Sequence, residues 1–194
     1  MKNKKNNQSI VIKEIYEKHK KELTGINTDK GTQIVTYEEK NKKNMKKEVL
    51  GFTAGNFDLL HPGYIITFEE AKRHCDNFIV FLQKDPSKHR KSKYKPVIPL
   101  YDRYKALMAI KYIDAVYIYQ TEKELYNLIK FWEPDIRILG EDYIGDNGKH
   151  KPFTGDDLPP KVIYTSRSHD WSTTKLKDLI TKQTLKQNPD INKK

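Results

Sequence analysis

A glycine turn followed by a histidine is the first segment whose residues could do chemistry. It reads Gly55-Asn56-Phe57-Asp58-Leu59-Leu60-His61-Pro62-Gly63-Tyr64 and lies between an apolar run and a helical pattern. Free backbone N–H groups and the positive end of a helix dipole favour a phosphate at such a helix start. His61 adds a donor, and Tyr64 follows three residues later on the same helix face. The segment predicts a phosphate site; a plain helix cap with a solvated histidine is the alternative.

A second polar segment precedes the last helical pattern and offers similar chemistry. It reads Arg167-Ser168-His169-Asp170-Trp171-Ser172-Thr173-Thr174-Lys175, and its hydroxyls and free N–H groups could hold phosphates. The alternative is an ordinary helix cap formed by Ser172. A metal site built from His169 and Asp170 is rejected, because adjacent side chains rarely point together. The chain has no convincing Ser-His-Asp or Cys-His set, so the predicted chemistry is phosphate alignment and charge neutralisation.

The elements that must position these segments alternate between strand and helix. Apolar runs predict strands at 49–54, 78–82, 115–119, 136–139 and 161–165, and helical spacing predicts helices at 62–75, 100–112, 121–132 and 173–182. This alternation predicts an α/β, Rossmann-like, five-stranded parallel sheet with helices on both faces. Ligands of such sheets bind beyond the carboxyl ends of the strands. The polar segments at 53–58, 83–87, 140–143 and 166–174 all follow strands, so we expect them to converge on one rim.

The charge is unevenly distributed along the chain. Residues 1–48 hold 13 lysines against 7 acidic residues, a net +6 of the formal +11. We therefore interpret residues 1–47 as a basic arm or extension, 48–183 as the catalytic domain and 184–194 as a polar tail. The net positive charge suits phosphate-bearing partners. A Lys/Asn-rich arm is only weak support for a nucleic-acid partner. A single cysteine, Cys75, and the lack of an apolar span or signal-peptide core predict a cytoplasmic protein without a membrane partner.

Both polar segments resemble signatures of the cytidylyltransferase-like nucleotidyltransferases. The first resembles a His-x-Gly-His pattern after a strand and a Phe-Asp pair, with Tyr64 in place of the second histidine. The second resembles an arginine followed by an Ile-Ser-Ser/Thr-Thr-Lys-type turn, and the resemblance covers about Val49 to Ile180. It implies four catalytic residues, namely His61, Tyr64, Lys93 and Arg167. It also implies a nucleotide site formed by Thr53, Gly55, Asn56, Phe57, His61, Gly63, Tyr64, Gly140, Asp142, Tyr143, Arg167, Ser172, Thr173 and Thr174.

The middle of the chain resembles the glycerol-3-phosphate cytidylyltransferases. The run Lys111-Tyr112-Ile113-Asp114-Ala115-Val116 and the preceding Arg103 carry this likeness. It implies that Lys95, Arg103, Lys111 and Asp114 bind the acceptor, although a lysine can equally be a solvated surface charge. The implied reaction transfers CMP from CTP to a phosphorylated small molecule such as glycerol 3-phosphate and releases pyrophosphate. Mg²⁺ is the implied cofactor, with no protein side chain assigned as its ligand, and a homodimer is the implied assembly.

Two alternatives stay open. The segments 82–87 and 96–103 also resemble sugar-phosphate adenylyltransferases, which indicates ATP as donor. A nucleotide-binding or nucleic-acid-binding protein that has lost catalysis is the second alternative. It is favoured by Tyr64, because a tyrosine carries no positive charge near neutral pH.

Overall fold

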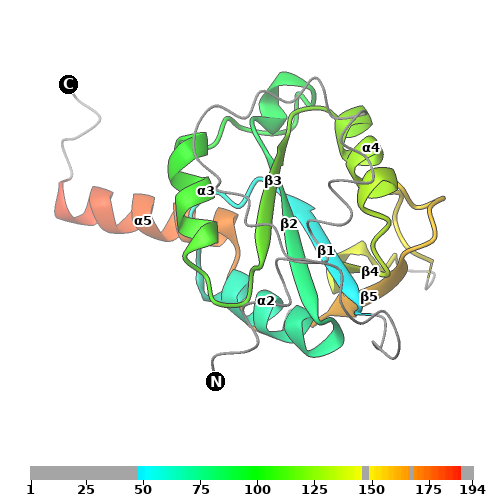
Figure 1. Cartoon of the computed structure of the whole chain (residues 1–194). Coiled ribbons are helices and arrows are strands. Elements are labelled where there is room, and N and C mark those ends of the chain that lie inside the picture. Colours follow the sequence, from blue (N-terminus) through cyan, green and yellow to red (C-terminus); the bar gives the residue numbers. More distant parts are fainter. Residues whose placement is uncertain (1–47, 146–148, 167, 189–194) are drawn as a thin grey trace, which may run out of the picture. The chain divides into compact units, whose positions relative to one another are not determined.

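Five parallel strands form one sheet in the computed structural model, which describes residues 48–145, 149–166 and 168–188. The strand order is β3-β2-β1-β4-β5 (Figure 1). The strands are β1 (Leu50–Gly55), β2 (Asn77–Gln83), β3 (Ala115–Tyr119), β4 (Ile136–Gly140) and β5 (Lys161–Thr165). The predicted α/β, Rossmann-like parallel sheet is confirmed. The predicted arm at 1–47 and the residues from 189 onward lie outside the described part of the chain.

Helices cover both faces of this sheet, as the sequence predicted. They are α2 (Pro62–His74), α3 (Leu100–Met108), α4 (Glu122–Trp132) and α5 (Thr173–Gln187), with short 3₁₀ turns at Pro86–Lys88 and Glu141–Tyr143. In Figure 1, α3 and α4 lie on opposite sides of the strands. Phe68 of α2 and Leu107 of α3 belong to the same core cluster as Phe78 of β2. On the other face, Trp132 of α4 packs on Tyr117 of β3, with ring centroids 4.5 Å apart.

Strand β2, which lies between β3 and β1, is buried along its whole length. Its sequence, Asn77-Phe-Ile-Val-Phe-Leu-Gln83, is a continuous apolar run rather than an alternating one, which is typical of a strand covered on both faces. Burying these side chains stabilises the fold by roughly 25 cal/mol for each Å² of apolar surface removed from water. The core therefore fixes the sheet, and the sheet in turn fixes where the polar segments after each strand lie.

Two predicted boundaries differ from the structure. Helix α3 ends at Met108 instead of 112, because the chain turns tightly there: the N–H of Ile110 bonds to the carbonyl of Leu107 at 3.0 Å. The predicted boundary between domain and tail at 183/184 falls inside α5, which continues to Gln187. Its last residues are polar, but lysine, glutamine and leucine are strong helix formers. Every described helix is too short or too polar to cross a bilayer.

Candidate active site

A cavity of about 930 Å³ lies at the carboxyl edge of the sheet. The last residue of each of the five strands lines it, namely Gly55, Gln83, Tyr119, Gly140 and Thr165. Its volume is in the range typical of small-molecule sites. The expectation that the polar segments converge on one rim is therefore met by the geometry.

Every described residue that the sequence assigned to the nucleotide or to catalysis lines this cavity. Their roles in binding stay predictions, and Arg167 lies outside the described residues. The set comprises Thr53, Gly55, Asn56, Phe57, His61, Gly63, Tyr64, Lys93, Gly140, Asp142, Tyr143, Ser172, Thr173 and Thr174.

Two helix starts direct their positive ends to the cavity. Helix α2 begins at Pro62 after His61, and α5 begins at Thr173 after Ser172, whose side chain accepts the N–H of Lys175 at 3.1 Å. Neither helix has an acidic residue in its first turn. The free N–H groups and dipoles at these ends favour anions, so the pair is suited to a polyphosphate.

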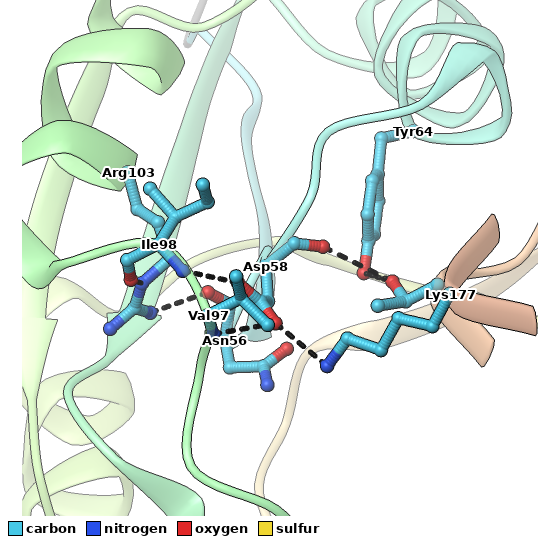
Figure 2. A network of polar contacts seen from close by, with 8 residues as sticks. Asn56, Asp58, Tyr64, Val97, Ile98, Arg103 and Lys177 are labelled. Atoms are coloured by element: carbon cyan, nitrogen blue, oxygen red, sulfur yellow. Dashed lines mark hydrogen bonds and ion pairs between the residues drawn. The ribbon is translucent and has the colours of Figure 1, made fainter. Parts of the chain in front are cut away.

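Asp58 holds the segment between β1 and α2 in place. Its side chain is 1% exposed and accepts the N–H groups of Val97 at 3.0 Å and Ile98 at 2.9 Å (Figure 2). Lys177 of α5 reaches the same carboxylate at 3.0 Å. Burial alone would raise the pKa of Asp58, but the two backbone N–H groups and Lys177 outweigh it and lower the pKa below 3.8. The ionised carboxylate therefore ties the segment to the 97–98 loop and to α5.

The backbone around Asp58 is strained. Phe57 and Leu59, on either side of it, have φ angles of 46° and 51°, in the left-handed region that residues other than glycine rarely adopt. Such strain persists only where the surroundings enforce it, and it is common at binding sites. Two contacts hold this backbone in place. The buried ring of Phe57 packs against Phe68, and the carboxylate of Asp58 is fixed by its hydrogen bonds.

Tyr64 joins the two predicted phosphate segments. Its hydroxyl lies 3.2 Å from the hydroxyl of Thr173, which in turn donates to the carbonyl of Asp58 at 3.2 Å (Figure 2). Its ring stacks on His61, with centroids 4.3 Å apart, and meets Phe57 edge-on. Tyr64 thus both packs on the core and lines the cavity, and its hydroxyl contacts the start of α5.

The structure corrects the prediction that Arg103 binds the acceptor. Arg103 is 2% exposed and does not line the cavity. Its guanidinium donates hydrogen bonds to four backbone carbonyls. These are Ile98 at 2.9 Å, Asn56 at 2.6 Å, Gln83 at 2.9 Å and Lys84 at 2.6 Å. Burial is the main influence on its pKa and lowers it. Arg103 therefore fixes the loops after β1 and β2 instead of meeting a substrate.

None of the other three residues predicted to bind the acceptor is part of the cavity lining, and their role in binding stays a prediction. Asp114 accepts the N–H of Phe78 at 2.6 Å and pairs with Lys72, which places it at the amino ends of β2 and β3. Lys111 lies over the ring of Tyr112 in the same connection. Because the strands are parallel, this edge is opposite the cavity. Lys95 is exposed and is not part of the cavity lining.

The sequence reasoning missed several charged residues on the lining. Arg90 donates to the Gln83 side chain at 2.8 Å and lies 3.9 Å from Glu122. Arg137 is 5% exposed, lies between the rings of Phe52 and Phe153 and bonds to the carbonyl of Thr154. Burial lowers the pKa of Arg137 to about 10. Arg137 could have been found from the sequence, because it is a charged residue inside the apolar run of β4.

The two helix starts meet at the carboxyl edge of a parallel sheet, with cationic side chains beside them, and this arrangement suits the phosphates of a nucleotide. A family model described as cytidylyltransferase-like matches residues 52–179, and the chain belongs to this family. The resemblance drawn from the two polar segments is thus confirmed.

Proteins named bifunctional protein HldE are similar in sequence. The one from Campylobacter jejuni is 39% identical over 140 residues, which is 72% of this chain and 29% of that protein. The one from Gluconacetobacter diazotrophicus is 41% identical over 98 residues, 50% of this chain and 20% of that protein. The chain therefore spans less than a third of these relatives.

A solved structure from Thermoplasma volcanium, titled a lipopolysaccharide core biosynthesis protein, has the same fold. It matches with a TM-score of 0.53 and 21% identity, over 63% of this chain and the whole of that one.

Proposed function

We propose that this nucleotidyltransferase transfers AMP from ATP to the phosphate of a phosphorylated sugar and releases pyrophosphate. The observation that carries the proposal is the pair of helix starts at one cavity, joined through Tyr64, Thr173 and Asp58. A triphosphate laid across both starts would present its α-phosphate to the rest of the cavity.

The reaction needs alignment more than acid–base chemistry. An oxygen of the acceptor phosphate attacks the α-phosphorus, the bond from that phosphorus to the bridging oxygen breaks, and pyrophosphate leaves with the bonding electrons. A phosphate monoester has a second pKa of about 6 and is mostly a dianion at pH 7, so no general base is required. Negative charge grows on the leaving group, and fixed donors aimed at it lower the barrier. His61, Lys93 and the two helix starts line the cavity and can supply them.

Mg²⁺ is proposed as the metal that accompanies the nucleotide. Among the described residues there is no group of three or more His, Cys, Asp or Glu side chains that could hold a metal ion. Mg²⁺ keeps several waters and binds chiefly to substrate phosphates, so it needs few protein ligands. Bound there, it would neutralise part of the charge on the triphosphate.

The choice of ATP and a sugar phosphate over CTP and glycerol 3-phosphate is supported by the resemblance of the segments 82–87 and 96–103 to sugar-phosphate adenylyltransferases. Gln83 and Pro86, from the segment that resembles sugar-phosphate adenylyltransferases, line the cavity. Lys111 and Asp114, from the segment that resembles glycerol-3-phosphate cytidylyltransferases, lie at the opposite edge of the sheet. The similarity to the HldE proteins supports the same choice.

Other charged residues of the cavity lining are proposed to bind the acceptor. They are Arg90, Arg137 and Glu122. The cations would attract the acceptor phosphate, and the carboxylate of Glu122 can accept hydrogen bonds from sugar hydroxyls. A polar acceptor with both a phosphate and hydroxyls matches this mixture of charges.

Pyrophosphate release tests the proposal directly. Each of the four nucleoside triphosphates would be assayed with Mg²⁺ against a panel of sugar phosphates, glycerol 3-phosphate and phosphorylated nucleosides. ATP with a sugar phosphate is expected to give the highest kcat/KM. Faster release from CTP with glycerol 3-phosphate would overturn the choice of substrates. Nucleotide binding without release from any pair would instead support a protein that has lost catalysis.

A further inference from the structure

The imidazole of His169 lies where the two phosphate segments meet. A methyl group placed on Gly63 would lie 2.6 Å from Cε1 and 3.1 Å from Nδ1 of His169, and 3.0 Å from Nδ1 of His61. Two histidine rings, one from each segment, therefore converge on the same point at the start of α2. His61 and His169 both line the cavity. Only a glycine at position 63 leaves room for this arrangement.

The ring nitrogens of His169 are unsatisfied in the described part of the protein. Nδ1 and Nε2 are both shielded from solvent, and neither has a hydrogen-bond partner there. The neighbouring carboxylate of Asp170 bonds instead to Lys175, at 2.7 Å. Buried polar atoms without partners destabilise a fold, and each such case calls for an explanation. A phosphate oxygen at the start of α2 would provide the missing acceptor.

Because Tyr64 is neutral, a second imidazole would add a charged donor at the start of α2. It stands one helical turn after His61, but its side chain is neutral and its hydroxyl contacts Thr173 at 3.2 Å. Transfer of a nucleotidyl group builds negative charge on the leaving pyrophosphate, which an imidazole N–H stabilises better when it is protonated.

We propose that His169 is a second active-site imidazole, which donates a hydrogen bond to the triphosphate beside His61. This inference rests on the proposed function. In this proposal His169 contacts the nucleotide. The absence of a side chain at Gly63 leaves room for the His169 ring, and Tyr64 holds the start of α5.

Two substitutions separate this role from simple packing. His169→Phe keeps a ring against Gly63 but removes both nitrogens, whereas His169→Gln keeps an N–H donor and removes the ring. We expect kcat for pyrophosphate release to fall at least tenfold in His169→Phe and less in His169→Gln, with little change in Tm for either. A packing role predicts the reverse order. His74→Gln, an exposed histidine at the other end of α2, serves as the control and should keep wild-type kcat.

Rescue gives a second readout. Adding Tyr64→His to His169→Phe should recover part of the lost rate, because it returns an imidazole to the start of α2. Wild-type kcat in both His169→Phe and His169→Gln would overturn the inference while leaving the proposed function intact. If the wild type releases no pyrophosphate, the proposed function fails, and calorimetry with inorganic tripolyphosphate decides on His169. A roughly tenfold weaker affinity of His169→Phe supports its role, and equal affinities exclude it.

Discussion

Asp58 illustrates how one buried carboxylate can organise a binding segment. The residue lies between two positions with left-handed backbone and bonds to two N–H groups of a loop about 40 residues further along the chain. Lys177 adds an ion pair from the last helix. Because the charge is compensated from several directions, the buried carboxylate stays ionised and the strained backbone around it is held.

Asp58→Asn should therefore destabilise the protein by about 2–3 kcal/mol at pH 7, the scale of hydrogen bonds to a charged group. The folded-state pKa of Asp58 is lowered, so its contribution is present above the ordinary carboxyl pKa and is lost as the pH falls through the folded value. Urea unfolding of both proteins should show a difference at pH 7 that shrinks as the pH falls below the ordinary carboxyl pKa. A difference that does not depend on pH would contradict this account.

Tyr64→Phe should reduce kcat about tenfold if the Tyr64 hydroxyl donates to the nucleotide in the transition state, where a lost hydrogen bond costs about 1.4 kcal/mol. The stacked ring remains on His61, so Tm should change little. Steady-state kinetics on pyrophosphate release provides the measurement. Tyr126→Phe is the matched control, since it removes an exposed hydroxyl that bonds to Asp157 away from the cavity. Wild-type kcat in Tyr64→Phe would limit Tyr64 to packing.

At the scale of elements, α3 acts on the site through Arg103. Its guanidinium bonds to carbonyls in the loops after β1 and β2, so the helix positions both loops without entering the cavity. Lysine keeps the positive charge but lacks the planar fork that reaches several acceptors. Arg103→Lys should therefore lower the free energy of unfolding by about 3 kcal/mol and raise KM for the nucleotide. Denaturant titration and kinetics would check both effects, and an unchanged KM would argue that the loops keep their positions without Arg103.

The elements also show what the sequence could and could not predict. The strands at 115–119 and 161–165 were predicted to the residue, because short apolar runs between turn signals leave little choice. The position of the cavity followed from the rule that parallel strands share a carboxyl edge. Arg103 was misassigned, because the sequence alone does not distinguish an arginine that bonds to internal carbonyls from one that binds a ligand. His169 and Arg137 were not assigned to the site, since their place depends on packing between elements far apart in sequence.

For the whole molecule, the chain divides into a unit at Met1–Glu48 and a unit at Val49–Lys194. The sheet, its helices and the cavity all belong to the second unit. A protein starting at Lys47 should therefore fold with its full set of strands and keep its turnover. Circular dichroism and the pyrophosphate assay would test this, and loss of folding would show that the first 46 residues stabilise the second unit. Assembly as a homodimer stays a prediction, for sedimentation to test.

The bond between Thr173 and Asp58 joins positions 115 residues apart. Helix α5 has no buried residue, so little apolar surface holds it against the sheet, and polar contacts such as this bond fix its first turn. The last helix is therefore expected to open locally at a lower free energy than the sheet needs to unfold. Inactivation should then precede denaturation: in rising urea, activity should be lost while the circular dichroism of the sheet is retained. Bound nucleotide should bring the two transitions together, and coincident curves without nucleotide would contradict this view.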